Sequence, residues 1–132
     1  MVATQTTVSK QVKKIPSTVR PTVNAARRAV KTAAPKAKEI AYQSKPPRSK
    51  SAMWKLARYA VGEEYVIGIG AFSTYAAVFF YRGRELDDAT GLLQGSGKDA
   101  RFTRLRSPAD AERPALKRLV RNAFALASAR RE

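Results

Sequence analysis

The sequence predicts an α+β fold in which an antiparallel sheet of four to five strands is packed by N-terminal and C-terminal helices. Segments rich in β-branched and aromatic residues fill the middle of the chain, between two stretches whose apolar residues recur at helical spacing. Several of these strand segments follow one another closely, which favours antiparallel pairing. The length of 132 residues fits one domain.

The first regular element expected is a helix over residues 18–34, where apolar residues recur three or four positions apart. These residues are Val19, Val23, Ala26, Val30 and Ala33. Ser17 or Thr18 is the expected N-terminal cap of this helix. Residues 1–14 show no periodicity, so we expect a flexible basic lead-in there and a single domain over residues 15–132.

Strands are expected next, and their limits follow from alternation and from the turn residues between them. The segments are residues 38–43, 53–59, 65–72, 75–81 and 100–106. Only Ser73 and Thr74 separate the third and fourth strands, which predicts a hairpin. Both faces of this hairpin are apolar, so we expect cover on each side or a partner over one face. Gly68 and Gly70 share a face and are expected to admit a closely packed helix or to mark a bulge.

The last element expected is an amphipathic helix. Its apolar stripe consists of Leu116, Leu119, Val120, Ala123, Phe124 and Ala127. Ser107 and Asp110 form an expected capping box at its start. Pro114 interrupts the first turn and restarts the helix.

Three segments carry a family resemblance: residues 68–81 (GIGAFSTYAAVFFY), 91–98 (GLLQGSGK) and 101–107 (RFTRLRS). With further matches from Ile15 onward, residues 15–127 resemble the bacterial YdhG-like family of small domains of unknown function. The resemblance implies an antiparallel sheet packed by both terminal helices, with a frataxin-like shape. It also implies a frataxin-like intracellular iron chaperone as an alternative function. The chain departs from the family pattern after Tyr42, where the usual glycine is missing, and in its opening helix, which has no acid.

The chain is strongly basic, with 26 Lys and Arg against 10 Asp and Glu and a net charge of +16. Residues 1–60 hold fourteen of the basic residues and a single acid, Glu39. A polyanion such as RNA or DNA responds to such charge, because each neutralised phosphate releases counterions. The alternative interpretation is a solvated basic face that only keeps the protein soluble.

The candidate anion-binding residues lie on a loop and on the last strand: Lys45, Arg48, Lys50, Arg104 and Arg106. Strand alternation places Arg104, Arg106 and Phe102 on one face. We expect these cations to position phosphates without reading sequence. The alternative is a solvated edge strand that its charge protects from aggregation.

Tyr75, Phe79 and Tyr81 also share one strand face. They are either part of a core or the lining of a ligand cleft or homodimer interface, because two terminal helices need not cover both faces of the sheet. The sequence leaves these alternatives open.

Catalytic and metal chemistry find little support. The chain contains no Cys and no His, which excludes disulfides, thiolate zinc sites, Cys nucleophiles and triads with an imidazole base. Gly95–Lys98 resembles a phosphate loop, but Leu92 and Asp99 break that pattern. Glu85, Asp87 and Asp88 suggest a cation site, and we interpret them as a turn fixed by Asx hydrogen bonds. No catalytic residue, metal or cofactor is expected.

The leading hypothesis is a non-catalytic binding module whose basic surface meets a nucleic acid. The alternatives are the iron chaperone and a small-ligand or homodimer module that uses the aromatic face. The longest apolar stretch, residues 65–81, is broken by Gly68, Gly70, Ser73 and Thr74, so no membrane span is expected. No signal-peptide core is apparent, and we expect a cytoplasmic protein.

Overall fold

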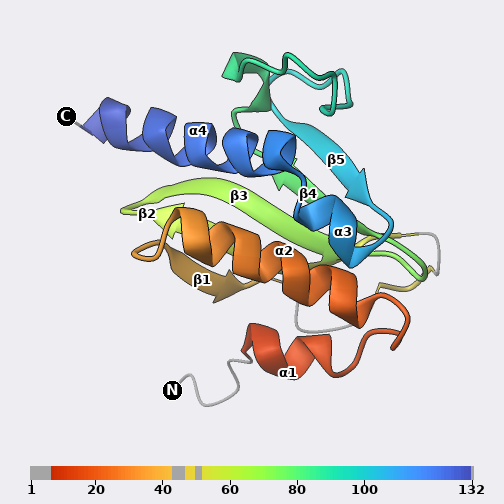
Figure 1. Cartoon of the computed structure of the whole chain (residues 1–132). Coiled ribbons are helices and arrows are strands. Elements are labelled where there is room, and N and C mark those ends of the chain that lie inside the picture. The colour runs from red at the N-terminus through yellow and green to blue at the C-terminus, as the bar shows by residue number, and fades with distance from the viewer. Residues whose placement is uncertain (1–6, 43–46, 50–51, 132) are drawn as a thin grey trace, which may run out of the picture.

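The predicted α+β fold is confirmed in a computed structural model that describes residues 7–42, 47–49 and 52–131 (Figure 1). In the sequence, the five strands of an antiparallel sheet come between helices at the two ends of the chain. In chain order the elements are α1 (Val8–Val12), α2 (Arg20–Ala33), β1 (Lys38–Ala41), β2 (Trp54–Val61), β3 (Glu64–Ala71), β4 (Ala76–Phe80), the 3₁₀ turn η1 (Gly83–Glu85), β5 (Arg101–Leu105), α3 (Pro108–Ala111) and α4 (Pro114–Arg131).

The strands form a meander in the order β1-β2-β3-β4-β5, so each strand pairs with its neighbours in sequence. Continuous pairing lines up side chains in rows across the sheet. One row crosses all five strands: Ile40, Arg58, Gly68, Phe79 and Phe102. A second row crosses four strands: Lys55, Gly70, Ala77 and Arg104. Both rows lie on the same face of the sheet.

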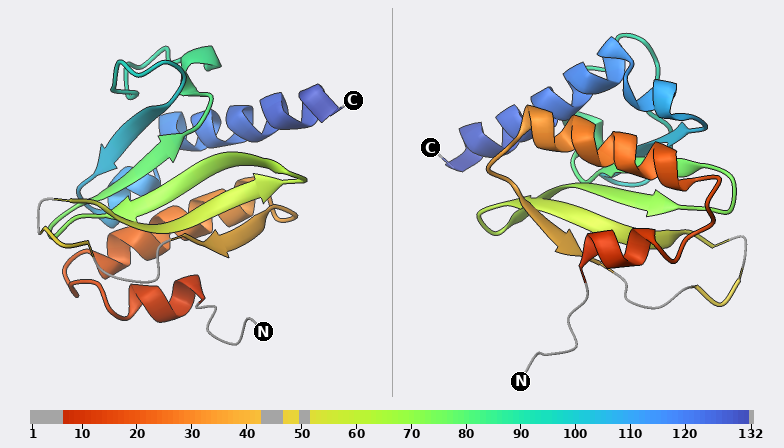
Figure 2. Two further views of the ribbon diagram at one scale, coloured as in Figure 1. Left: turned by 180° about the vertical axis from the view of Figure 1, so that it is seen from behind. Right: turned by 60° about the horizontal axis from the view of Figure 1, so that its bottom comes forward.

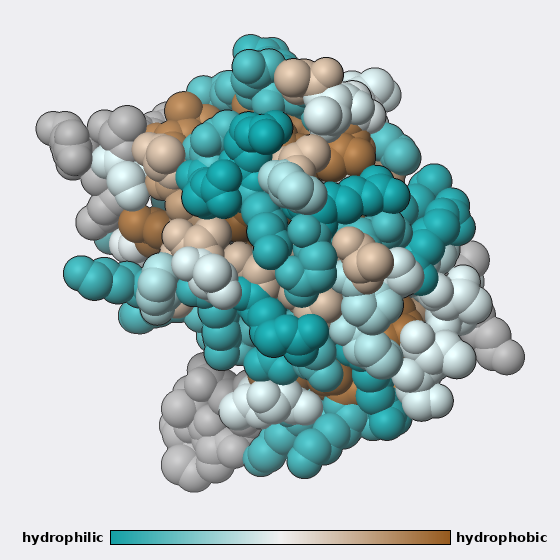
Figure 3. Space-filling view, viewed as in Figure 1, coloured by the Kyte–Doolittle hydropathy of each residue, from teal (hydrophilic) through white to brown (hydrophobic). Residues whose placement is uncertain are grey.

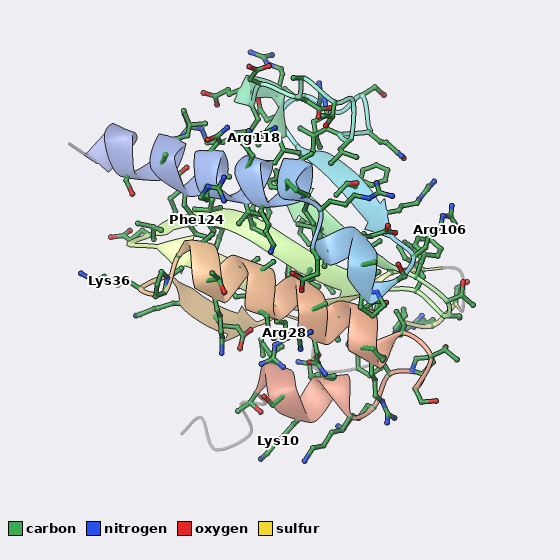
Figure 4. The ribbon with its side chains drawn as sticks, viewed as in Figure 1. Lys10, Arg28, Lys36, Arg106, Arg118 and Phe124 are labelled. Atoms are coloured by element: carbon green, nitrogen blue, oxygen red, sulfur yellow. The ribbon has the colours of Figure 1, made fainter. Side chains whose placement is uncertain are left out.

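The helices lie against the opposite face, which becomes the core (Figure 1). The apolar side chains on this face of the sheet are almost fully buried: Leu56, Tyr59, Ile67, Ile69, Val78 and Phe80. Val23 and Val30 of α2 and Leu116 and Val120 of α4 pack against them. Phe124 joins the same core from α4 (Figure 4). The two long helices therefore bury the apolar stripes that predicted them.

The reverse view shows the strands in front and the helices behind them (Figure 2, left). We call this uncovered side the open face, and the two rows described above lie on it. Phe79 and Phe102 are half-buried there, and Arg104 is exposed. The sequence predicted either cover on both faces of the hairpin or a partner over one face. In the described part of the chain, helices cover one face of the hairpin.

The structure differs from the sequence prediction at α1, which lies within the expected lead-in. Val8, Gln11 and Val12 are buried, and Trp54 Nε1–H donates to Gln11 Oε1 at 3.2 Å. The Lys10 amide donates to Thr7 Oγ1, which caps the helix. The prediction of a flexible segment is therefore wrong over Val8–Val12.

The predicted helix caps are only partly correct. Val19 is the N-cap of α2 and makes no side-chain cap bond, while the Thr18 hydroxyl donates to the Ser73 carbonyl at 3.4 Å. Ser107 is the N-cap of α3, but its side chain does not cap either. Asp110 Oδ2 instead accepts the Arg106 amide at 2.8 Å. Pro114 starts α4, as predicted.

An ion pair ties α2 to the first two strands. Arg27 donates through Nε and Nη2 to the two carboxylate oxygens of Glu39, each at 2.9 Å, and the Tyr59 hydroxyl donates to Glu39 Oε2. Burial alone would raise the pKa of Glu39, but the hydrogen bonds from Arg27 and Tyr59 outweigh it and hold that pKa below its ordinary value of 4.5. Burial and the Glu39 hydrogen bond raise the pKa of Tyr59. The pair is therefore a structural clamp between the helix layer and the sheet.

The connection from β4 to β5 is held by its acidic residues. Arg82 pairs with both Glu64 and Glu85. The Asp88 carboxylate accepts hydrogen bonds from the amides of Leu92 and Leu93 at 2.9 and 2.7 Å, which confirms the predicted Asx turn.

In the described ranges, no helix combines the length and hydrophobicity needed to cross a membrane.

Candidate functional site

Two sets of residues that the sequence identified separately meet on the open face. Phe79 of β4 pairs with Phe102 of β5, which brings the aromatic set beside the arginines. The guanidinium carbon of Arg104 lies 5.5 Å from the Phe102 ring centroid and 5.7 Å from that of Tyr75. Arg106 also lies 5.7 Å from the Tyr75 ring. The rings and the cations therefore form one surface of alternating character.

A hollow of about 240 Å³ lies in the middle of this surface. Its lining residues are Met53, Phe72, Ala77, Phe79, Phe102 and Arg104. The hollow exists because the second row has a small residue, Ala77, beside the long side chain of Arg104. The floor is therefore low and the walls are mostly aromatic. We call it the aromatic hollow.

The two glycines of β3 make room for side chains that lie over them. A Cβ at Gly68 would stand 2.1 Å from Phe79 Cε2, and one at Gly70 would stand 2.4 Å from Met53 Sδ. The side chains of Phe79 and Met53 thus lie over the glycines, where the sequence suggested a packed helix. The bulge suggested as the alternative lies opposite Gly70, where the pairing of β2 shifts register between Lys55 and Ala57. These close approaches bring Phe79 and Met53 down onto the sheet, where they wall the aromatic hollow.

A second cluster on the open face was not predicted. The Arg58 guanidinium lies between two tyrosine rings, 4.5 Å from the Tyr42 centroid and 4.1 Å from the Tyr65 centroid. Lys55 Nζ lies 5.3 Å from the Tyr42 ring. Burial and the neighbouring Tyr42 phenol raise the pKa of Tyr81, whose ring lies 6.3 Å from that of Tyr65. The two stacked rings hold Arg58 in a fixed orientation.

The open face is electrostatically one-sided. Among the described residues, no carboxylate pairs with Lys55, Arg58, Arg104 or Arg106. Six of the described acids are engaged elsewhere, by basic side chains or backbone amides: Glu39, Glu64, Glu85, Asp88, Asp110 and Glu112. Lys55, Arg104 and Arg106 are exposed and therefore available to an anion, and Arg58 is partly buried between its two tyrosine rings.

The loop residues predicted to bind anions are placed in part. Lys45 and Lys50 lie outside the described residues. Arg48 is exposed and lines a second hollow of about 220 Å³. Phe72 lines both this hollow and the aromatic hollow, but Ile15 and Trp54 of the helix side also line the second one, so Arg48 lies where the open face meets the helix side.

The helix side carries cations of a different kind. The space-filling view of this side is largely hydrophilic (Figure 3), and Arg28 and Arg118 lie on its helices (Figure 4). A groove of about 270 Å³ between α2 and α4 is lined by Arg28, Lys117 and Arg121, but also by Glu112, which pairs with Lys117. It contains no aromatic residue. This side resembles a solvated basic surface.

The other candidate sites lack the required geometry. Within the described ranges, no three His, Cys, Asp or Glu side chains gather where a metal ion would bind. Glu85 pairs with Arg82, and Asp88 accepts backbone amides, so these acids hold the connection between β4 and β5. The Gly95–Lys98 segment leads into strand β5, whereas a phosphate loop leads into a helix whose N-terminus faces the phosphate.

No family model, curated protein or solved structure matches this chain. The similarity to the YdhG-like family therefore remains a prediction from the sequence.

Proposed function

We propose that this chain is a non-catalytic binding module for nucleic acid and that the open face of the sheet is its binding surface. The observation that supports this is the combination of Arg58, Arg104 and Arg106 with aromatic rings on a face that pairs them with no carboxylate in the described chain. Unpaired cations attract phosphates, and each phosphate contact releases counterions.

Nucleic acid fits this face better than other polyanions do, because its chain alternates charged phosphates with flat bases. The open face alternates in the same way, with guanidinium groups 4.1–5.7 Å from tyrosine and phenylalanine rings. Rings of this kind stack on bases without regard to sequence. A membrane surface presents phosphates without bases and leaves the rings without a partner of their own kind.

Each cation of the open face would contact a phosphate of the bound strand. Arg104 and Arg106 hold phosphates beside the aromatic hollow, and Arg58 and Lys55 hold them at the β2 side of the sheet. Arg48 extends the path past Phe72. These contacts position the strand without reading its sequence.

An iron chaperone, the alternative function, fits the described residues less well. Two of the acids that suggested a cation site already have partners. Glu85 pairs with Arg82, and Asp88 accepts hydrogen bonds from the amides of Leu92 and Leu93. The residues of the open face are cationic and aromatic, which suits an anion.

A salt series tests the proposal. The affinity of the full chain for a fluorescent oligothymidylate is measured by anisotropy at increasing salt. With three or four phosphate contacts, the logarithm of the association constant should fall against the logarithm of the salt concentration with a slope of about −2 to −3. An affinity that stays constant across the series would remove the electrostatic basis of the proposal.

A further inference from the structure

We infer that the aromatic hollow receives one unpaired base of a bound strand, so that the protein prefers single strands to duplexes. This inference rests on the proposed function and adds to it the form of nucleic acid that binds. The hollow is an apolar depression within a cationic face, and that combination selects for a flat apolar group attached to an anionic chain.

The floor and walls of the hollow have the shape that a base requires. Ala77 forms a low centre, and Met53, which lies over Gly70, forms one side. The Phe79 ring lies over Gly68 and can approach the backbone closely there because glycine has no side chain. Phe102 is paired with Phe79 across the strands, and its backbone is bridged to Gln94 on its other side. The close packing of the Phe79 ring on Gly68 restricts that ring, which lowers the entropic cost of stacking a base on it.

The charges at the rim decide between a base and a purely apolar occupant. Arg104 lines the hollow, and Arg106 lies near the same Tyr75 ring. A second copy of this chain would bring another +16 charge against these cations, which opposes close approach. A nucleotide brings a phosphate for the arginines with every base.

Base pairing in a duplex prevents a base from entering the aromatic hollow. A paired base is stacked on both faces inside the helix, and extruding it costs a few kcal/mol. A single strand offers its bases without that cost. The hollow therefore adds affinity for single strands alone, while the arginines attract both forms.

The test compares three ligands of matched length with the full chain: an oligothymidylate, the same backbone without bases, and the oligothymidylate paired with its complement. Stacking of one base predicts about tenfold tighter binding of the oligothymidylate than of the abasic backbone. The duplex should also bind about tenfold more weakly. Equal affinity for all three would overturn the inference.

Two variants locate the effect. Ala77→Val raises the floor of the hollow without changing a charge or a ring, and Phe102→Leu removes one aromatic wall. Each should lower the affinity for the oligothymidylate about tenfold and leave the affinity for the abasic backbone unchanged. Phe102→Tyr is the matched control and should keep the wild-type affinity. Circular dichroism of each variant checks the fold, and the two changes act on different strands, so one of them remains informative if the other unfolds.

The outcomes separate this inference from the proposed function. If all three ligands bind equally and with a steep salt dependence, the nucleic-acid function stands and the base site is wrong. If none binds, the proposed function fails. If sedimentation equilibrium instead finds a dimer that Ala77→Val dissociates, the hollow is an interface between copies, and the inference is overturned.

Discussion

The ring of Phe79 lies over the backbone of Gly68, where any larger residue would place a Cβ 2.1 Å from the ring. The two residues are direct partners on β4 and β3, at the middle of a row that continues to Arg58 and Phe102. This close approach lays the central ring of the open face against the sheet. A glycine in the middle of a strand weakens it, and here the packing of an aromatic ring offsets that cost.

Gly68→Ala should therefore destabilise the protein by about 1–3 kcal/mol, because the added methyl group displaces the ring. Urea unfolding followed by fluorescence measures the change. In the double variant Gly68→Ala/Phe79→Ala the clash is absent, so the loss should be smaller than the sum of the two single losses. Strictly additive losses would contradict the contact.

Arg58→Met keeps an apolar stem between Tyr42 and Tyr65 but removes the guanidinium. We expect a loss of about 0.5–2 kcal/mol in unfolding free energy from the two ring contacts. The salt slope for oligothymidylate should also become shallower by about one unit, since a phosphate contact is lost. The matched control is Arg118→Met on the exposed side of α4. If both variants changed the slope equally, Arg58 would have no special place in the site.

The Glu39 clamp predicts a specific sensitivity to acid. The pKa of Glu39 is lower in the folded protein than its ordinary value of 4.5. The stability that Glu39 contributes is therefore fully present above the pKa of the unfolded chain, and it is lost as the pH falls through the lower pKa of the folded protein. Glu39→Gln should be less stable than the wild type at neutral pH, and the difference should shrink as the pH falls below 4.5.

Urea unfolding of both proteins between neutral and acidic pH measures this difference. Glu63→Gln, an exposed change in the turn between β2 and β3, is the control and should follow the wild type. A gap between wild type and Glu39→Gln that stays constant with pH would show that the carboxylate of Glu39 does not titrate in the way the clamp requires.

The sequence was sufficient for the fold class because its strand and helix patterns are long and regular. The apolar stripe on α4 and the two-residue turn at Ser73 and Thr74 are examples. In the structure, the Phe72 amide donates to the Tyr75 carbonyl at 2.8 Å, which closes that turn. The short helix α1 was missed because five residues are too few to show a period. Its burial depends on a distant partner, since Gln11 is bonded to Trp54.

The site was predicted in fragments. Strand alternation correctly grouped Arg104 with Arg106 and Tyr75 with Phe79, but nothing in the sequence indicated that β4 and β5 would bring the groups together. Arg58 was missed for a physical reason. The pairing of β2 shifts register between Lys55 and Ala57, so Lys55 and Arg58 share a face although they are three residues apart. Strict alternation places them on opposite faces.

The most direct test of the open face is a comparison of two charge reversals of equal size. Arg104→Glu/Arg106→Glu changes the open face, and Arg118→Glu/Arg121→Glu changes exposed positions on α4 by the same net charge. The affinity of each variant for oligothymidylate is measured by anisotropy at a fixed salt concentration, after circular dichroism confirms the fold. We predict that the first variant loses more than about tenfold in affinity and the second stays within about twofold of the wild type. Equal losses in the two variants would contradict a binding surface on the sheet and would leave only the overall charge of the chain.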